Sequence, residues 1–375
     1  MKCLYITNTY LHGRSGVVNA SKAFINAFAA LSNSFTLVCP SNNENAIEDI
    51  NANNICVVPV ADKRSSIVKF VQLLFGKIHR FSDETKKLFD KSKYDLVVFD
   101  ASPVTFHLIK VAKQAGLKTI TIHHNYQMEY VKDDTDTILK YPLLFWTYIS
   151  ERQAVINSDI NLTLTQSDAD SLKIHYCRSA VFEVVGVFEH SPQIKDVVVN
   201  SINKRHFVIT GQLSSLQTKN SLLPWINNYY PIIRSVFPDS KLTIAGRNPS
   251  DDLIKVCKSN GIEIIPSPDD IDSIVKDADY YICPTSLGSG LKLRIMDGMK
   301  YGLSVLSHEK SARGYEEMMK KGILYSYSDE DSFKRNLNSM VSNSISKQTV
   351  IDIYYSWFSF EAGKERLKTI LDKYI

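Results

Sequence analysis

The chain has 375 residues, of which 44% are hydrophobic and 22% charged, a composition that excludes an intrinsically disordered protein. Its formal net charge of +4 is too small for a dedicated nucleic-acid binder, although it suits an anionic substrate or a membrane surface. The length favours two domains, and no apolar leader or membrane-spanning run of roughly 20 residues is evident, so we expect a cytoplasmic protein, with any membrane contact peripheral on the inner face of the plasma membrane.

Strand-like and helix-like runs alternate from the N-terminus onward, and the strands are continuous apolar runs typical of a parallel sheet covered on both faces. A helix is predicted over residues 17–31, and another begins at Ser102, the expected N-cap, with Pro103 at the first helical position. Strands in the first half are predicted at residues 2–7, 35–40, 55–60, 95–100, 119–124, 160–165 and 181–187.

Two strand ends in this half carry candidate site residues. Gly13 and Gly16 precede the first helix, where a loop can touch a substrate or a diphosphate, although a plain strand–helix turn has the same pattern. The turn is not GxGxxG and no acidic residue ends the second strand, so a nicotinamide dinucleotide is disfavoured. His123, His124 and Asn125 end another strand and can hydrogen-bond a sugar hydroxyl or support a reaction centre, unless they merely cap the strand.

Residues 63–93 include a basic amphipathic helix. Such a helix can lie on an anionic membrane, and the alternative is that it covers a sheet. Its apolar stripe and the basic residues that flank it are Ile67, Val71, Leu74, Phe75 and Ile78, with Lys69, Lys77, His79 and Arg80.

No metal site is predicted. The six cysteines lack CxxC spacing and are expected to be free thiols, and the histidines form no HxxxH pattern. Two acidic strings resemble the DxD motif of metal-binding glycosyltransferases. Asp134-Thr135-Asp136 lies in a polar loop, and Asp270-Ile271-Asp272 opens a helix, where acids interact favourably with the helix dipole. We interpret both strings as structural.

The alternation restarts in the second half. The predicted organisation is a first domain over residues 1–190, a polar linker over 191–204, a second domain over 205–345 and a crossover helix over 346–375. Strands are predicted at 206–213, 241–246 and 262–267, with a helix from about residue 220 to 237. Two such halves favour two doubly wound α/β domains that bind a ligand between them, beyond the carboxyl ends of the strands.

Residues 280–308 carry the most informative pattern: a buried strand, a glycine-rich turn, a helix and a second buried strand. Gly288 and Gly290 let the backbone approach a ligand closely, and Lys292 adds a cation at the helix start. Asp297 places a carboxylate within reach of hydroxyl groups. A diphosphate attached to a sugar satisfies all of these groups, although most turns of this kind bind nothing.

Two further features accompany this turn. The strand at 206–213 contains Gly211 and Gln212 near its end, and Lys219 follows a polar loop, where it either neutralises a diphosphate leaving group or is simply solvated. Gly298 lies in mid-helix at a cost of about 1 kcal/mol relative to Ala, so we expect another group to approach it closely.

Through these motifs, residues 206–308 resemble the retaining GT-B glycosyltransferases of the family-4 type (glycosyl transferases group 1), and the first half is colinear with them. The resemblance implies two Rossmann-like domains that face an interdomain cleft and a C-terminal helix that returns to the N-terminal domain. It also implies that Lys219 contacts the donor diphosphate, that Asp297 binds the ribose hydroxyls and that His123 lies near the transferred sugar. The backbone at Pro268 would contact the base.

Three positions depart from the family pattern: Gln212 stands where the family has arginine, Ser289 where it has the first acid of a pair, and Asp297 where it has glutamate. The acceptor side is assigned to Gly13, His124 and Asn125, and catalysis to His123 and Lys219. The donor is assigned to Gly16, Gly211, Lys219, Pro268, Ser289, Gly290, Leu291, Lys292 and Asp297.

The expected activity is a metal-independent, retaining transfer of a hexose from a UDP-sugar, in preference to a GDP-sugar, without any cofactor. The acceptor hydroxyl would belong to a glycan, a lipid-linked intermediate or a protein, and the pathway would assemble a surface polysaccharide or glycoconjugate. No nucleic acid is expected as a partner. Two alternatives remain: a catalytically silent sugar-nucleotide-binding scaffold, because of Gln212 and Ser289, and a sugar-nucleotide epimerase on the same fold.

Overall fold

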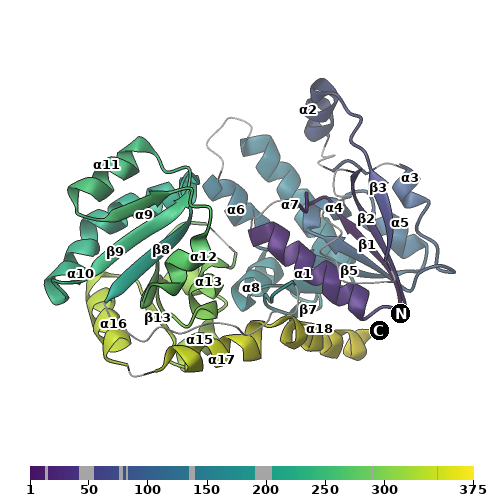
Figure 1. Ribbon diagram of the computed structural model, residues 1–375. Helices are drawn as coiled ribbons and strands as arrows, with labels where there is room; N and C mark the ends of the chain where they lie inside the picture. Colours follow the sequence, from purple (N-terminus) through teal and green to yellow (C-terminus); the bar gives the residue numbers. More distant parts are fainter. Residues whose placement is uncertain are drawn as a thin grey trace. The chain divides into compact units, whose positions relative to one another are not determined.

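The computed structural model describes residues 1–12, 16–41, 55–75, 79–81, 83–134, 140–190, 205–288, 290–343 and 345–375. The chain divides into two compact units, the first comprising Met1–Gln193 with Phe358–Ile375 and the second Ile194–Trp357. Each unit is built on one parallel sheet, as predicted (Figure 1). The predicted linker, residues 191–204, lies outside the described residues.

The first unit contains a seven-stranded sheet in the order β3-β2-β1-β4-β5-β6-β7, and every adjacent pair is parallel. The strands that follow β1 extend the sheet first to one side and then to the other, with the reversal between β1 and β4. The strands are β1 (Lys2–Thr7), β2 (Ser34–Pro40), β3 (Ile55–Val60), β4 (Leu96–Asp100), β5 (Lys118–His123), β6 (Ile160–Thr163) and β7 (Phe182–Val184).

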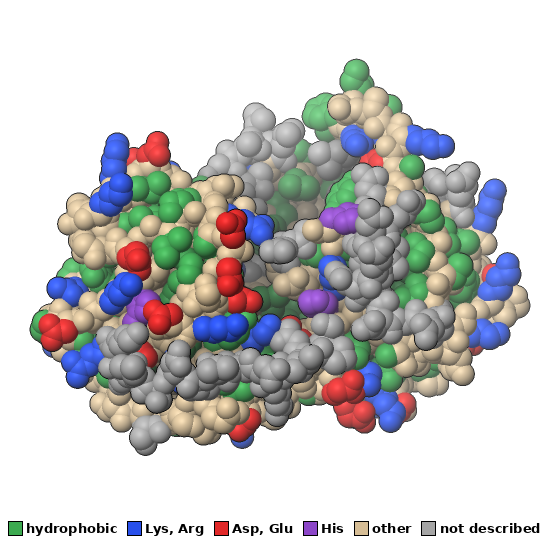
Figure 2. Space-filling model, in the orientation of Figure 1, with side chains coloured by type: hydrophobic (Ala, Val, Ile, Leu, Met, Phe, Trp, Pro, Cys, Tyr) green, Lys and Arg blue, Asp and Glu red, His purple; other side chains and the backbone are tan. Residues whose placement is uncertain are grey.

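Helices cover this sheet, except that α2 projects from it with hydrophobic side chains at its tip (Figures 1 and 2). The expected cap at Ser102 is wrong: Ala101 is the N-cap of α4, with no side-chain hydrogen bond, and Ser102 is the first helical residue. The helices are α1 (Gly16–Ala30), α2 (Ser66–Leu74), α3 (Asp83–Lys86), α4 (Ser102–Thr105), α5 (Ile109–Gln114), α6 (Gln127–Asp134), α7 (Lys140–Asn157), α8 (Gln166–His175) and α18 (Phe360–Tyr374).

The last helix, α18, packs on the first unit beside α1 (Figure 1). Arg366 donates from Nε to the carbonyl of Val185 at 3.0 Å and from Nη2 to that of Val187 at 3.2 Å. A Cβ atom at Gly363 would collide with the Phe188 ring, so only glycine allows the helix to lie this close. The predicted return of the C-terminal helix to the N-terminal domain is confirmed.

The second unit contains a six-stranded parallel sheet in the order β10-β9-β8-β11-β12-β13. The order reverses between β8 and β11, and in open sheets of this kind ligands bind beyond the carboxyl ends of the strands at such a switch point. The strands are β8 (His206–Gln212), β9 (Lys241–Arg247), β10 (Glu263–Pro266), β11 (Tyr280–Cys283), β12 (Ser304–His308) and β13 (Leu324–Tyr327).

Two helix predictions for this unit need correction. The predicted helix over residues 220–237 is two helices, α9 and α10, separated at Tyr229. The first begins at Leu216 rather than near residue 220, because the Ser215 hydroxyl caps it by accepting from the Thr218 amide. The C-terminal stretch is two helices, which Ser359 separates as the N-cap of α18. The helices are α9 (Leu216–Asn228), α10 (Tyr230–Val236), α11 (Asp251–Ser259), α12 (Ile271–Lys276), α13 (Arg294–Lys300), α14 (Glu309–Ala312), α15 (Glu316–Lys320), α16 (Glu330–Ser342) and α17 (Lys347–Phe358).

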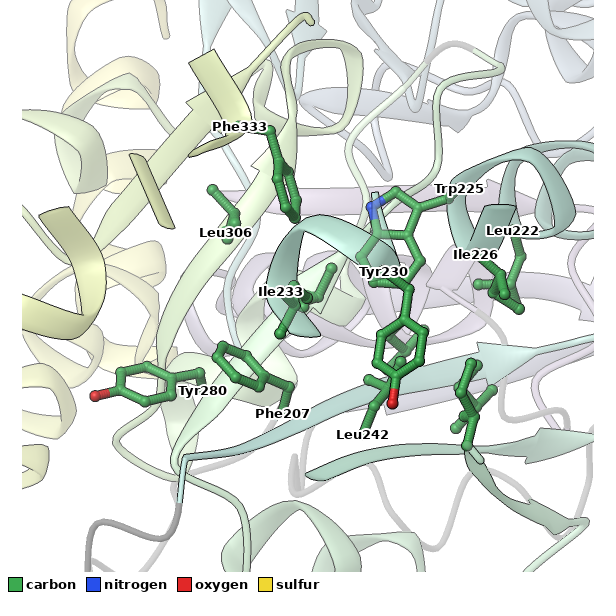
Figure 3. Packing of buried hydrophobic residues seen from close by; sticks show 14 of the residues in the cluster. Phe207, Leu222, Trp225, Ile226, Tyr230, Ile233, Leu242, Tyr280, Leu306 and Phe333 are labelled. Atoms are coloured by element: carbon green, nitrogen blue, oxygen red, sulfur yellow. The ribbon is translucent and has the colours of Figure 1, made fainter. Parts of the chain in front are cut away.

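Aromatic and branched side chains fill the core of the second unit (Figure 3). Phe207 of β8 stacks on Tyr280 of β11 at 5.3 Å, and Trp225 of α9 meets Phe333 of α16 edge-on at 6.2 Å. These contacts join the two halves of the sheet and the helices above it. The group that approaches Gly298 closely, as predicted, belongs to the protein itself: a Cβ at Gly298 would lie 2.7 Å from Cβ of Tyr281. Close helix–strand packing therefore explains this glycine.

Among the described helices, none is both long and apolar enough to cross a bilayer. The six cysteines are free, and four of them are buried.

Candidate functional site

In the second unit, a guanidinium group lies against the end of β8. Arg294, the first residue of α13, donates to the hydroxyls of Thr285 and Thr218, each at 3.3 Å. A Cβ at Gly211 would lie 3.0 Å from the Arg294 Cζ atom, and Gly211 has a φ of 146°, which side-chain-bearing residues rarely adopt. The glycine therefore provides both the backbone conformation and the space that the guanidinium occupies.

The glycine turn packs against the first turn of α9. A Cβ at Gly288 would collide with the Gln217 side chain, and Gln217 Oε1 accepts from Lys292 Nζ at 3.3 Å. The Tyr315 hydroxyl fixes the same segment by donating to the Lys292 carbonyl at 3.1 Å. As a result, the turn, the Lys292 ammonium and the N-terminal turn of α9 come together, and helix N-termini present N–H groups to anions.

Lys219 lies in the second turn of α9, half-buried, rather than in a loop. Its helix therefore also carries the contacts of Gln217 and Thr218 to the cations of the turn. Three basic side chains, Lys219, Lys292 and Arg294, are thus placed on the short segments that surround the carboxyl end of β8.

Asp297, Gly290 and Pro268 complete the described donor candidates. Asp297 is exposed on α13, and its charge helps to raise the pKa of the buried Tyr281 hydroxyl, although burial is the larger cause. Gly290 has a φ of 76°. Pro268 is half-buried just after β10, two strands from β8 and therefore roughly 10 Å along the sheet edge. Leu291 is half-buried, and Ser289 lies outside the described residues.

Gln212, one of the three positions that depart from the family pattern, has arginine neighbours in space. Gln212 is exposed and stands in register with Arg247 at the end of β9. The Arg294 guanidinium lies against the preceding residue, Gly211. Arg247 and Arg294 therefore place positive charge near Gln212, although residue 212 itself is uncharged.

In the first unit, the two adjacent histidines at the end of β5 have different environments. His123 is 1% exposed, and its Nε2 is 2.9 Å from Oδ1 of Asn161. Burial is the main cause that lowers the pKa of His123 to about 4, so its imidazole is neutral at physiological pH. The other ring nitrogen of His123, Nδ1, has no hydrogen-bond partner among the described residues, so it could bond to a ligand.

His124 is paired with a buried carboxylate. Its Nε2 lies 2.6 Å from Oδ1 of Asp100 at the end of β4, while Oδ2 of Asp100 accepts from the Thr7 hydroxyl at 2.8 Å. Burial alone would raise the pKa of Asp100, but the imidazole and the hydroxyls of Thr7 and Ser21 outweigh it and hold the pKa below its usual value. These residues lie at the switch point between β1 and β4.

Buried carboxylates hold the segment that follows the histidines. Glu151 accepts from the amide of Gln127 at 2.7 Å and from the Tyr176 hydroxyl at 2.8 Å, and Asp168 accepts from the Tyr126 amide at 3.0 Å. Burial raises the pKa of Glu151 to about 7. These bonds fix the start of α6, so the half-buried Asn125 has a defined backbone.

Gly16 begins α1 and is exposed, while Gly13 lies outside the described residues. Asp270 caps α12 by accepting from the amides of Asp272 and Ser273, which agrees with a structural role for the second DxD string. The first string, Asp134-Thr135-Asp136, cannot be assessed because its side chains lie outside the described part. Within that part, no group of three His, Cys, Asp or Glu side chains could hold a metal ion.

Sequence reasoning missed four residues of these arrangements: Asp100, Glu151, Arg247 and Arg294. Asp100 ends a predicted strand and Arg247 directly follows another, so a search for polar residues at every strand end would have found them. Arg294 lies between the predicted site residues Lys292 and Asp297 in the sequence, but its contact with Gly211 depends on how α13 packs. Glu151 lies in α7, where polar and apolar residues are mixed, so nothing in the sequence distinguishes it from an exposed glutamate.

Part of the chain is similar to a known protein family. Residues 180–343 match the family described as Glycosyl transferases group 1. A protein of Klebsiella pneumoniae described as an uncharacterized 44.6 kDa protein in the cps region is 24% identical over 237 residues, and the match spans 59% of each chain.

Solved structures share the fold over nearly the whole chain. Anabaena HepE in complex with UDP and glucose is 11% identical with a TM-score of 0.65 over 100% of both chains. Sucrose-phosphate synthase from Thermosynechococcus elongatus is 10% identical with a TM-score of 0.69 over 99% of this chain and 98% of that one. The lipopolysaccharide outer core galactosyltransferase WaaB is 13% identical with a TM-score of 0.66 over 100% of both. Residues 180–343 are therefore similar to the group 1 glycosyl transferases, and the chain has the two Rossmann-like domains of the GT-B fold.

Proposed function

We propose that the protein transfers a sugar from a UDP-sugar to an acceptor hydroxyl with retention of anomeric configuration. The observation that carries this proposal is the set of cations around the end of β8: Lys292 and Arg294 lie at the glycine turn, and both contact the first turn of α9. A diphosphate is the ligand that such a set of cations, glycines and helix N–H groups would hold best.

The proposed chemistry uses these cations to stabilise the leaving group. The bond between the anomeric carbon and the distal phosphate oxygen breaks, and negative charge develops on the diphosphate. Preorganised cations lower the free energy of this transition state most when they need not reorient, and Arg294 is already held by two threonine hydroxyls. The acceptor oxygen bonds to the anomeric carbon on the same face, and its proton passes to the departing phosphate oxygen. This scheme requires neither a metal nor a cofactor.

The remaining donor contacts follow from position along the sheet edge. Asp297 would accept hydrogen bonds from the ribose hydroxyls, and the backbone near Pro268 would contact the base. UDP is favoured because HepE is described in complex with UDP, with UDP and glucose, and with UDP-glucose. A role in surface polysaccharide assembly is supported by the relative in a cps region and by the fold shared with a lipopolysaccharide galactosyltransferase.

A thermal-shift panel of UDP-, GDP- and ADP-sugars tests donor binding. We expect UDP-glucose or UDP-galactose at 100 times its dissociation constant to stabilise the protein by about 2.7 kcal/mol, which raises Tm by several degrees. GDP- and ADP-sugars should shift Tm less at the same concentration. No shift with any nucleotide sugar at millimolar concentration would contradict the donor site, whereas a shift without release of UDP would favour the silent scaffold.

The stereochemical outcome is a separate prediction because His124 and Asp100 could act as a base on an acceptor hydroxyl, which would favour inversion. We expect proton NMR of the first product to show the anomeric configuration of the donor. We also expect His124→Gln to lower the rate by less than about 10²-fold, the lower end of the contribution typical of a general base. An inverted product together with a larger loss would assign the base role to His124 and reject retention.

A further inference from the structure

The apolar side of α2 is exposed. Ile67 is 77% exposed and Phe75, just after the helix, is 72% exposed, while Phe70, Val71 and Leu74 are 45–49% exposed. Their spacing of three and four residues places them on one side of the helix, opposite Lys69 and Gln72. A helix that covered the sheet would bury this side, so the covering alternative is wrong for α2.

The exposed surface continues onto α7. The Trp146 indole donates to the Leu74 carbonyl at 3.1 Å, which ties the end of α2 to the first half of α7. On that part of α7, Tyr141 is 74% exposed and Phe145 is 57% exposed. We call the exposed side chains of α2, Phe75, Tyr141 and Phe145 the apolar face. Figure 2 shows hydrophobic side chains at the projecting tip, where Figure 1 places α2.

The sequence that contains α2 is basic. Residues 63–75 include three Lys and Arg and no Asp or Glu, and Asp62 immediately precedes them. Lys69, on the helix itself, has a half-exposed side chain whose Nζ lies 3.4 Å from Oδ2 of Asp62, and Arg64 binds the same carboxylate at 2.7 Å. The predicted flanking residues need correction in part: His79 is buried and its Nε2 donates to the Phe106 carbonyl at 2.7 Å, and Arg80 donates to Asn8 Oδ1 and to the Tyr10 hydroxyl.

We propose that the apolar face docks on an anionic lipid bilayer. The aromatic and aliphatic side chains would enter the boundary between headgroups and acyl chains, and the basic segment would add attraction to anionic headgroups. A second copy is a poorer occupant, because two-fold pairing through this face would bring two basic segments together. This inference goes beyond the proposed transfer reaction and does not depend on it.

The test is co-sedimentation of the full chain with vesicles of phosphatidylcholine alone or mixed with phosphatidylglycerol. We expect binding to the mixed vesicles that weakens as salt is raised, and at least about tenfold weaker binding for the double variant Phe70→Ser, Phe75→Ser. The control is Ile174→Ser on α8, which removes an exposed hydrophobic side chain outside the apolar face; Ile174 is 65% exposed. The control should bind as the wild type does.

Three outcomes would overturn the proposal: no binding to mixed vesicles, equal binding by the double variant and the wild type, or a lipid-free dimer in sedimentation velocity that the double variant abolishes. The last outcome would assign the face to pairing of two copies. All measurements are made without a nucleotide sugar, so they are independent of the donor site. Both phenylalanines are exposed, and an unchanged melting profile would show that the double variant is folded.

Discussion

Arg294→Gln and Lys292→Ala are each expected to slow the release of UDP from a UDP-sugar by about 10²–10³-fold, the loss typical when one preorganised donor to a developing negative charge is removed. Each side chain is held toward the proposed diphosphate position by a contact to the first turn of α9. Because the charge on the leaving group grows during bond cleavage, kcat should fall more than KM rises. The measurement is steady-state UDP release, with and without an added sugar acceptor.

The matched control is Lys258→Ala on α11, which removes one positive charge of the second unit at the last turn of another helix. It should leave kcat within about twofold, as expected for a surface change away from the reacting groups. Arg294→Lys separates charge from geometry, since lysine cannot reproduce the two bonds to threonine hydroxyls. Wild-type kinetics in both Arg294→Gln and Lys292→Ala would place the donor diphosphate elsewhere.

Glu151→Gln is expected to stabilise the first unit relative to the wild type, and this gain in the free energy of unfolding should be about 3 kcal/mol larger at pH 8 than at pH 4.5. The folded-state pKa of Glu151 is raised to about 7 from 4.5, so the folded protein binds the proton more tightly than the unfolded chain. The carboxyl therefore contributes stability below pH 4.5, and that contribution is lost as the pH rises through 7. Glutamine is neutral at every pH and can still accept from the Gln127 amide.

His123 acts in the opposite direction over nearly the same interval. Its folded-state pKa is lowered to about 4 from 6.5, so its contribution to stability is present above pH 6.5 and is lost as the pH falls towards 4. In the wild type the two trends largely offset each other, and Glu151→Gln should reveal the histidine trend alone. Hydrogen exchange of β5 and α7 amides at several pH values reports on the first unit by itself. A variant with the same pH dependence as the wild type would contradict the assignment.

Strand positions and sheet type were predictable because each central strand is a continuous apolar run, as a parallel sheet covered on both faces requires. Helix ends were harder to predict, since a single hydrogen bond decides them. Ser215 caps α9 four residues before the expected start, and Ser359 interrupts a helical pattern that is apolar on both sides of it. The glycine turn and its basic and acidic residues, from Gly288 to Asp297, could be recognised from the sequence because they lie close together in the chain.

The sequence by itself determined that this protein has two halves of alternating strands and helices, a glycine turn with a basic residue, and histidines at a strand end. Only the tertiary structure decided which side chains meet. Arg294 lies against Gly211 because α13 packs on β11, the neighbour of β8 in the sheet, and Asp100 binds His124 because β4 and β5 are neighbours. It also decided that the apolar side of α2 is exposed. The spacing of apolar residues predicts which side of a helix or strand is buried. Contacts between segments depend on how those segments pack, which no local pattern encodes.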